Sequence, residues 1–346
     1  VDTAAKMAIE DYIEQVNADG GWLGKKVQLV SYDVSKDPPT EAVTAATRLI
    51  DQDGVIGIVG ISGTASTLPI ISLCNENKVP CIASAATNTK VTVDEDTGET
   101  YPYMFRCCFI DPYQGTALAN FAYGDLGISE VATLTRVNNP YAVGVQEYFK
   151  DEYTSLGGKI VAELGYQETE VEFRAQLTAA ADAGAKAILV AASEYKDAGL
   201  IANQAKDLGL EFTFLLPDGV YANELLDVAS SALTNAYISV GADENDPEFA
   251  SWKAEFDAKH ANSGYSANIY TYYAMDSFML LEYAVKTAGT TDGEAIRNAL
   301  ENAKDAPCFT ESITIDPATH NPLNKSITVL TVKDGAYTVY KTYKPQ

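Results

Sequence analysis

Apolar runs alternate with helix-like periods along most of the chain. The spacing of apolar residues predicts helices at 4–16, 39–51, 66–77, 113–126, 141–156, 173–183, 197–208, 222–230, 246–261, 267–288 and 292–303. Short apolar runs predict strands at 27–32, 55–59, 80–83, 131–135, 159–164, 187–191, 212–215, 236–240, 312–315, 326–332 and 337–343. Repeated alternation of strand and helix is typical of parallel sheets with helices on both faces. The sequence therefore predicts an α/β fold of doubly wound parallel sheets.

Two loops rich in small and hydroxylated residues follow two of these strands. Residues 62–66 (SGTAS) follow the strand at 55–59, and residues 84–88 (SAATN) follow the strand at 80–83. Because the carboxyl ends of parallel strands meet at one edge of the sheet, we expect both loops to lie at that edge, where open α/β sheets bind ligands. Hydroxyls and backbone N–H groups at the start of a helix suit a small anion such as a carboxylate. Neither loop holds a strong base or nucleophile, which favours binding over catalysis.

The length and the charge limit the remaining classes. A chain of 346 residues suggests two domains, and 24 basic against 48 acidic residues give a net charge of −24. A surface this acidic repels phosphate backbones, so we expect no nucleic-acid binding. No apolar run approaches the roughly 20 residues that span a bilayer. No low-complexity linker separates the two halves, which predicts a chain that crosses more than once between its domains.

The residue types that commonly form metal or redox sites do not form a recognisable pattern. The five cysteines lack the spacing of a zinc site, and Cys74 and Cys81 are either bridged or buried as free thiols. His260 and His320 lie in unrelated segments, and we expect both on solvated surfaces. The acidic run 94–99 lacks the ligand pattern of a calcium loop and predicts a solvated excursion. We therefore predict no metal and no cofactor.

Several short motifs occur in one order along nearly the whole chain. They are NADGG with LGK at 17–25, YD with DP at 32–38, GISGT at 60–64, SAAT at 84–87, FR with D and QG at 105–115, and YAMD at 273–276. In this order they resemble the extracytoplasmic solute-binding proteins of branched-chain amino acid ABC transporters, the Leu/Ile/Val-binding protein family. Family members begin with a strand and a loop before the first helix, whereas this sequence begins within that helix. We expect any ligand contact from such a loop to lie outside the sequence.

The resemblance implies a type I periplasmic binding fold, in which two doubly wound parallel-sheet lobes are joined by a multi-crossover hinge. It places an N-terminal ligand-binding lobe at 1–112 and 246–325. The C-terminal ligand-binding lobe is then formed by 113–245 and 326–346.

The resemblance also assigns roles in the first lobe. Thr64 occupies the position of a residue that binds the ligand carboxylate, and Thr87 the position of a second carboxylate ligand. Ala85 matches a position whose backbone carbonyl accepts from the α-ammonium group. From the residues alone, sequence statistics favour Thr64 as the N-cap of the following helix, and the other two residues belong to an ordinary loop.

In the second lobe the resemblance implies three further ligand-binding residues. Asp218 matches the acidic residue that binds the α-ammonium group, and we expect it at an exposed cleft edge. Tyr141 matches an aromatic residue at the cleft edge, and Tyr195 falls at a strand end where the family often places another cleft residue. The alternatives are a Pro-Asp-Gly turn for Asp218 and plain packing for Tyr195.

The function implied is that of a hinged trap for a small amino acid, branched-chain or otherwise aliphatic, which is delivered to an ABC permease. We expect a monomer, located in the periplasm or held outside the membrane as a lipoprotein. A receptor or regulator that uses the same trap as a sensor is an alternative. The other alternative is an α/β enzyme with Cys107 or Cys108 as nucleophile, although the sequence shows no nucleophile elbow and no cofactor fingerprint.

Overall fold

The computed structural model describes residues 3–34, 39–244, 246–323 and 325–343, so Asp37 and Pro38 of the second motif lie outside the described residues. The chain divides into two compact units. Unit 1 combines the chain up to Phe109 with Ala242–Lys325, and unit 2 combines Ile110–Gly241 with the segment from Ser326 onward. The chain therefore passes between the units three times. The assignment of 1–112 with 246–325 and of 113–245 with 326–346 to two ligand-binding lobes stays a prediction.

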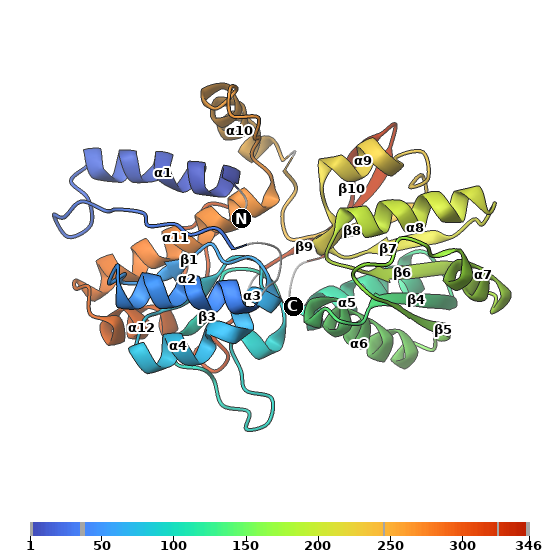
Figure 1. The fold of residues 1–346 in the computed structure, drawn as a ribbon, viewed down its shortest axis with the longest axis horizontal. Helices are drawn as coiled ribbons and strands as arrows, with labels where there is room; N and C mark the ends of the chain where they lie inside the picture. Colours follow the sequence, from blue (N-terminus) through green and yellow to red (C-terminus); the bar gives the residue numbers. More distant parts are fainter. Residues whose placement is uncertain (1–2, 35–38, 245, 324, 344–346) are drawn as a thin grey trace. The chain divides into compact units, whose positions relative to one another are not determined.

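Unit 1 is a small parallel sheet between helices (Figure 1). Its elements are α1 (Thr3–Ala18), α2 (Pro39–Asp51), β1 (Ile58–Val59), α3 (Thr64–Thr67), η1 (Leu68–Ile70), α4 (Ile71–Asn77), β2 (Cys81–Ala83), η2 (Thr89–Val91), β3 (Met104–Arg106), α10 (Pro247–Lys259), α11 (Ile269–Ala288) and α12 (Gly293–Glu301). The strand order is β1-β2-β3, and both pairs are parallel. Alternate strand residues face opposite sides: Ile82 and Phe105 pack with α1 and α11, whereas Cys81 and Met104 pack with α2 and α4. Helices therefore cover both faces, as predicted.

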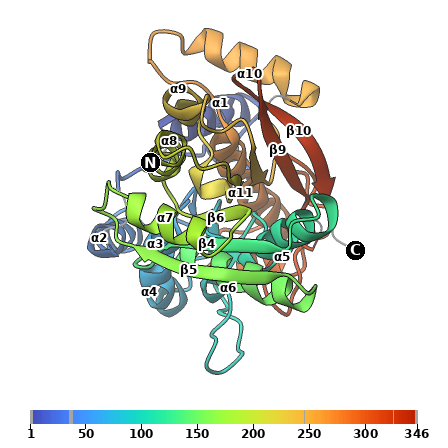
Figure 2. The same cartoon turned by 90° about the vertical axis from the view of Figure 1, so that its right-hand side faces the viewer.

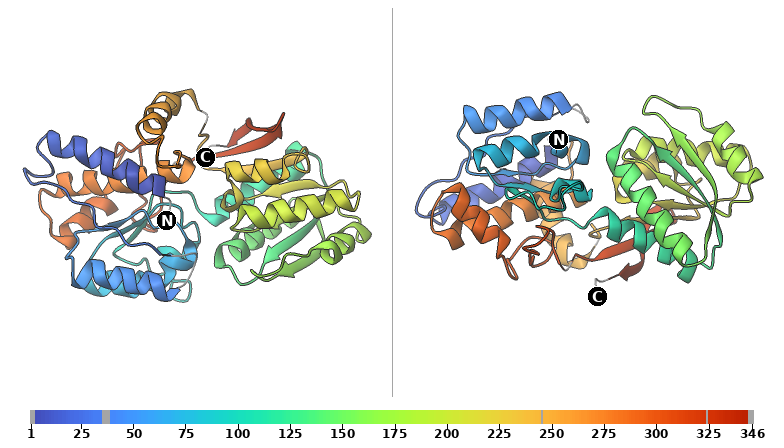
Figure 3. Two further views of the ribbon diagram at one scale, coloured as in Figure 1. Left: turned by 45° about the horizontal axis from the view of Figure 1, so that its top comes forward. Right: turned by 90° about the horizontal axis from the view of Figure 1, so that it is seen from below.

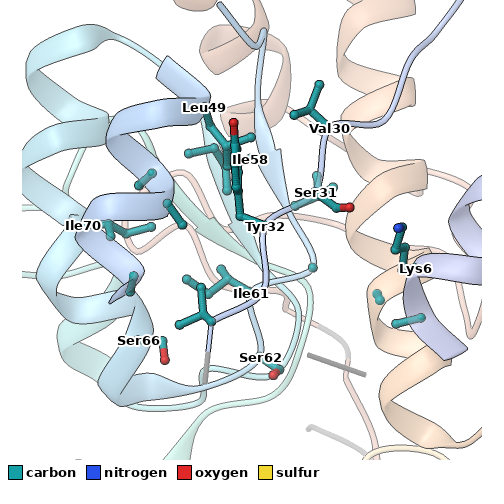
Figure 4. A pocket seen from close by; sticks show the side chains of 18 of the residues that line it. Lys6, Val30, Ser31, Tyr32, Leu49, Ile58, Ile61, Ser62, Ser66 and Ile70 are labelled. Atoms are coloured by element: carbon teal, nitrogen blue, oxygen red, sulfur yellow. The ribbon is translucent and has the colours of Figure 1, made fainter. Parts of the chain in front are cut away.

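Two of the predicted strands in unit 1 are wrong. Residues 27–32 are irregular chain and belong to no ladder of the described residues. A cavity of about 180 Å³ lies between this segment, α2 and β1, so the apolar side chains of the segment line a cavity instead of a sheet (Figure 4). Residues 312–315 form only isolated bridges, and Ile313 and Ile315 are buried in the helical core of the unit.

Unit 2 is a seven-stranded sheet with helices on both faces (Figures 1 and 2). Its elements are α5 (Asp111–Asn120), the π-helix η3 (Phe121–Asp125), β4 (Glu130–Arg136), α6 (Pro140–Ser155), β5 (Lys159–Tyr166), α7 (Arg174–Asp182), β6 (Ala187–Ala191), α8 (Tyr195–Asp207), β7 (Thr213–Leu216), η4 (Asp218–Val220), α9 (Asn223–Ala229), β8 (Ala236–Val240), β9 (Ile327–Lys333) and β10 (Ala336–Tyr343). Side chains of α5 and α6 form one core cluster with β4 and β6, and α8 and α9 lie on the opposite face (Figure 2).

The sheet of unit 2 is mixed rather than wholly parallel. Its order is β10-β9-β8-β7-β6-β4-β5. The strands from β4 to β8 are parallel to one another, and β9 is antiparallel to both of its neighbours, β8 and β10. Only Asp334 and Gly335, with φ of 51° and 76°, separate β9 from β10. Two-residue turns with positive φ at both positions are typical of hairpins between antiparallel strands. The hairpin of β9 and β10 is the red pair of strands in Figure 3.

Helix α11 holds each of the three chain segments that leave or enter unit 1. The Tyr272 hydroxyl donates to the Glu244 carbonyl at 3.5 Å, and the Cys107 thiol donates to the Tyr273 carbonyl at 3.3 Å. The Lys325 ammonium lies 3.0 Å from a carboxylate oxygen of Asp276. All of these contacts lie within unit 1. Positions 272, 273 and 276 of one helix therefore fix the chain close to every passage between the units.

Both histidines are less exposed than the sequence predicted. The expectation for His320 is wrong, because its ring is buried, stacks on Phe105 with centroids 4.1 Å apart, and donates from Nδ1 to the Met104 carbonyl at 3.0 Å. Burial lowers the pKa of His320. His260 is not on an open surface either, since it is partly buried and lies 2.8 Å from Asp11.

Of the two alternatives for Cys74 and Cys81, the structure has buried free thiols. The run 94–99 is a turn at the surface, as predicted. Among the described residues no group of acidic, histidine or cysteine side chains is arranged to hold a metal ion. No helix in the described parts of the chain is long and apolar enough to cross a membrane.

Candidate functional site

The first loop of unit 1 connects β1 to α3. Gly60 turns the chain with φ of 76°, and its N–H donates to the Ser277 hydroxyl at 3.1 Å. Gly63 is the N-cap of α3 and Thr64 is its first residue, so the N-cap alternative for Thr64 is wrong. The Thr64 side chain is buried, and its hydroxyl has no hydrogen-bond partner among the described residues.

The second loop of unit 1 lies directly against the first. The backbone N–H and the hydroxyl of Ser84 both reach the Ile61 carbonyl, at 2.9 and 3.2 Å. This contact confirms that the two loops meet at one edge of the sheet. The Thr87 side chain is fully buried, and its hydroxyl also lacks a partner among the described residues. Ala85 is half-buried in the same loop.

A buried arginine fixes the shape of this second loop. Arg106 ends β3 and has no exposed surface. Its guanidinium donates to the carbonyls of Ala86 and Asn88, both at 2.7 Å, and to the Thr92 hydroxyl at 3.2 Å. Hydrogen bonds from a charged donor are stronger than neutral ones, so the loop is held rigidly from behind. The sequence contained Arg106 in a motif, but nothing in its spacing indicated this role.

Unit 1 therefore presents two buried hydroxyls on two joined and rigid loops. A buried hydroxyl without a partner costs about 1–3 kcal/mol, and native proteins rarely retain one without a reason. Two such donors at the carboxyl edge of a parallel sheet suit an oxygen ligand with negative charge. We call Thr64, Ala85 and Thr87 the unit 1 half-site.

The polar group of unit 2 centres on Asp218, which follows β7. The Tyr141 hydroxyl lies 2.5 Å from Asp218 Oδ1, and the Gln114 amide donates to the same oxygen at 3.0 Å. The Gly219 N–H donates to the Tyr141 hydroxyl oxygen at 3.0 Å. We call Tyr141 and Asp218, with Gln114, the unit 2 half-site.

The expectation that Asp218 is exposed is wrong, because only 3% of its surface is accessible. Burial raises the pKa of Asp218, and the bonds from Tyr141 and Gln114 oppose this rise. Burial also raises the pKa of Tyr141 well above its usual value, so the phenol keeps its proton and donates it to the carboxylate. The result is a buried acidic group whose charge has hydrogen-bond donors around it.

The sequence did not indicate Gln114 or Gly219 as members of this group, and the structure does not join Tyr195 to it by a hydrogen bond. Gln114 stands in the motif shared with the resembled family, which was the available signal. A Cβ at Gly219 would lie 2.6 Å from the Tyr141 ring and 3.0 Å from the Ala192 carbonyl, so only glycine fits there. Tyr195 is the first residue of α8 and is half-buried, and no hydrogen bond of the described residues joins it to Asp218.

The cysteines proposed as nucleophiles lie in the core. Cys107 has no exposed surface and Cys108 has 2%. Burial raises the pKa of the Cys107 thiol well above its usual value. A reactive cysteine needs a lowered pKa and an accessible thiolate, and Cys107 has neither. The enzyme alternative therefore has no support from this residue.

Comparisons with known proteins identify the family of the chain. A family model described as periplasmic binding protein matches residues 1–336. The chain belongs to the periplasmic binding protein family. It is 28% identical over 293 residues to Leu/Ile/Val-binding protein homolog 1 of Brucella suis biovar 1. The alignment covers 84% of this chain and 76% of the relative.

Two solved structures of the family are similar over almost the whole chain. A leucine binding protein LivK from Thermotoga maritima MSB8 has a TM-score of 0.87 and 29% identity, covering 99% of this chain and 95% of that chain. LivJ from Streptococcus pneumoniae, a branched-chain amino acid transporter substrate binding protein in complex with isoleucine, has a TM-score of 0.87 and 26% identity, covering 99% and 94%. The resemblance and the type I periplasmic binding fold are thus confirmed. Members of this family are extracytoplasmic solute-binding proteins, not enzymes.

Proposed function

We propose that this chain is the solute-binding protein of an ABC transporter, and that it captures a small amino acid with a branched-chain or other aliphatic side chain for delivery to a permease. The names of the relatives support this class of ligand. The observation that carries the proposal is the pair of buried hydroxyls, Thr64 and Thr87, that have no partner among the described residues. An α-carboxylate offers them the acceptors they need.

The unit 1 half-site is proposed to bind the carboxylate end of the ligand. The hydroxyls of Thr64 and Thr87 and the Thr87 N–H donate to the carboxylate oxygens. The carbonyl of Ala85 accepts a hydrogen bond from the α-ammonium group. Because Arg106 holds this loop from behind, the donors are already oriented and little order has to be gained on binding.

The unit 2 half-site is proposed to bind the ammonium end. Asp218 supplies the negative charge that a buried ammonium group requires. The Tyr141 hydroxyl donates to the Asp218 carboxylate, and its ring is proposed to form part of the pocket wall. Tyr195 is proposed to contribute at the rim of the pocket. In this proposal the lobes at 1–112 with 246–325 and at 113–245 with 326–346 close around the ligand. Contacts made only in the closed form then shift the hinge equilibrium toward closure.

We further propose that the protein acts as a monomer, since a trap of this kind opens and closes without a partner subunit. It is proposed to work in the periplasm or as a lipoprotein held at the outer side of the membrane. The net charge of −24 argues against nucleic-acid partners.

A thermal-shift screen of the proteinogenic amino acids and small carboxylates tests the proposal without assuming the ligand. Ligand that binds only the folded state at 100 times its Kd adds about 2.7 kcal/mol of stability, so Tm rises by several degrees. We expect the rise with leucine, isoleucine, valine or a close analogue, and calorimetry then gives the affinity. An unchanged Tm with every amino acid would contradict the proposed function.

A further inference from the structure

A second buried arginine, Arg136, lies in unit 2 at the end of β4, where it is 3% exposed. Its guanidinium lies 2.7 Å from a carboxylate oxygen of Glu168, which follows β5, and 3.9 Å from one of Asp197, in the first turn of α8. The Tyr166 hydroxyl donates to the same Asp197 oxygen at 2.8 Å. A buried charge is costly unless such partners surround it. The guanidinium therefore has one defined place between β4, β5 and α8.

Arg136 holds the start of α6 by two routes. Its backbone carbonyl accepts a hydrogen bond from the Asn139 N–H at 3.1 Å. Its guanidinium donates to the Ser193 hydroxyl oxygen at 3.3 Å, and the Asn139 side-chain amide donates to that same oxygen at 3.0 Å. Asn139 is the N-cap of α6, and its Oδ1 accepts from the Ala142 N–H at 3.0 Å. The side chain that caps the helix is therefore joined to the guanidinium through a single hydroxyl.

Tyr141 lies two residues after this cap, in the first turn of α6. Its hydroxyl lies 2.5 Å from Asp218 Oδ1 and accepts from the Gly219 N–H at 3.0 Å. The Tyr141 ring packs directly on the Gly219 backbone, because a Cβ at that glycine would lie 2.6 Å from the ring. A phenol held this closely tolerates little displacement, so a shift of roughly 1 Å at the start of α6 would disrupt these contacts.

We infer that Arg136 is a positioning residue for the unit 2 half-site. It acts through Ser193 and Asn139 on the first turn of α6, and it thereby keeps the Tyr141 hydroxyl on Asp218. The inference rests on the proposed function, in which Asp218 binds the ligand ammonium group. It adds to that function a buried cation that acts on affinity through other side chains.

A double-mutant cycle on Arg136→Met and Tyr141→Phe tests this inference. Calorimetry measures the affinity for whichever of leucine, isoleucine and valine the wild type binds most tightly. We expect Arg136→Met alone to lower the affinity about tenfold, because the phenol is then displaced. In the Tyr141→Phe background the same change should lower the affinity less than threefold, since no hydroxyl is left to position. Effects of coupled residues are non-additive in this way, whereas those of independent sites add.

Arg174→Met is the matched control. Arg174 lies in the same unit and 2.6 Å from a carboxylate oxygen of Glu172, but its side chain is 46% exposed. We expect Arg174→Met to leave the affinity within twofold in both backgrounds. Ser193→Ala is a second test variant, because it breaks the connection to Asn139 while the guanidinium keeps its acidic partners. We expect it to lower the affinity about threefold in the wild type and to have no effect in Tyr141→Phe.

The outcomes separate this inference from the proposed function. An equal loss from Arg136→Met in both backgrounds, or no loss in a folded Arg136→Met protein, overturns the positioning role while amino-acid binding stands. If Arg136→Met does not fold, the same two outcomes for Ser193→Ala decide. A wild type that binds none of the three amino acids overturns the proposed function for branched-chain ligands and this inference with it. Far-ultraviolet circular dichroism and Tm of each variant establish that folded proteins are compared.

Discussion

The two half-sites differ in how well their polar groups are satisfied without a ligand. In unit 1 the hydroxyls of Thr64 and Thr87 are buried without a partner among the described residues. In unit 2 the Asp218 carboxylate receives hydrogen bonds from Tyr141 and Gln114. Under the proposed function, a ligand carboxylate supplies the acceptors that the two unit 1 hydroxyls lack, whereas a ligand ammonium group approaches a carboxylate that already has hydrogen-bond donors.

If the proposed roles hold, the carboxylate and the ammonium group of the ligand are recognised at different cost. Unsatisfied donors destabilise the free protein, and binding removes that penalty. A satisfied buried carboxylate stabilises its own surroundings, but it still supplies the charge that a buried ammonium group requires. Substitutions that remove the hydroxyl of Thr64 or Thr87 are therefore expected to trade affinity for stability, and substitution of Asp218 is expected to cost affinity most.

The largest expected effect is that of Asp218→Asn on amino-acid binding. The variant keeps the shape of the side chain but leaves the ligand ammonium buried without a negative partner, which costs about 3–5 kcal/mol. We expect the affinity measured by calorimetry to fall at least 100-fold. Asp182→Asn, an exposed site in the same unit, removes the same charge and should leave the affinity within twofold. An affinity of Asp218→Asn within threefold of wild type would refute the role of Asp218.

Arg106→Met is expected to reduce both stability and affinity. It removes the donors that hold the carbonyls of Ala86 and Asn88, and hydrogen bonds from charged groups contribute about 1.5–3 kcal/mol each. We expect the free energy of unfolding in urea to fall by about 2–4 kcal/mol and the affinity to fall more than tenfold, because the loop carrying Thr87 loses its support. The exposed Arg48→Met is the control and should change neither. Unchanged affinity in a folded Arg106→Met protein would show that the loop needs no such support.

The affinity is also expected to depend on pH through Asp218. Burial raises the pKa of Asp218 in the free protein, and an ammonium ligand favours the ionised carboxylate. Binding therefore lowers this pKa, so affinity is full above the free-protein pKa and falls by up to tenfold per pH unit below it. Calorimetry from neutral to acid pH measures the decline. Thr64→Val should keep the same pH profile at lower affinity, and a flat profile would argue against an ionised Asp218 as the ammonium partner.

Thr64→Val and Thr87→Val are expected to have the smallest effect on binding. Unlike the other variants, they are expected to increase the stability of the free protein. Each change removes one donor to the ligand and should weaken binding about tenfold. Each also removes a buried hydroxyl without a partner, so the free protein should gain up to about 1 kcal/mol in stability. Urea unfolding and calorimetry on the same samples measure both. A loss of stability in both variants would show that the hydroxyls are satisfied in the free protein.

The sequence predicted what depends on local pattern. The helical and strand periods located nearly all the elements. Two hydroxyl-rich loops after parallel strands were expected to meet, and the contacts of Ser84 with the Ile61 carbonyl confirm this. The pattern at 27–32 is that of a strand, but a ladder also needs a partner, which the segment's own residues do not specify. The antiparallel end of the sheet had a local signal in Asp334–Gly335, a turn dipeptide typical of hairpins.

Long-range contacts explain what the sequence could not predict. His320 is buried because Phe105 and Met104, far away in the chain, pack against it. The support of one loop by Arg106 and the hydrogen bonds of Ser193 with Arg136 and Asn139 likewise arise only when separate segments meet. The resemblance gave the positions of Thr64, Thr87 and Asp218. Only the fold shows that the hydroxyls of Thr64 and Thr87 lack partners among the described residues and that the Asp218 carboxylate has hydrogen-bond donors.

The central claim is that Asp218 binds the ligand ammonium group, and a ligand analogue tests it most directly. Calorimetry compares leucine with isocaproate, which is leucine without its ammonium group, on the wild type and on Asp218→Asn. We predict that loss of the ammonium group weakens binding to the wild type at least 100-fold but weakens binding to Asp218→Asn far less, because only the proposed hydrogen bond to the Ala85 carbonyl is then lost. An equal loss in both proteins would contradict the account, because the ammonium group would then be recognised elsewhere.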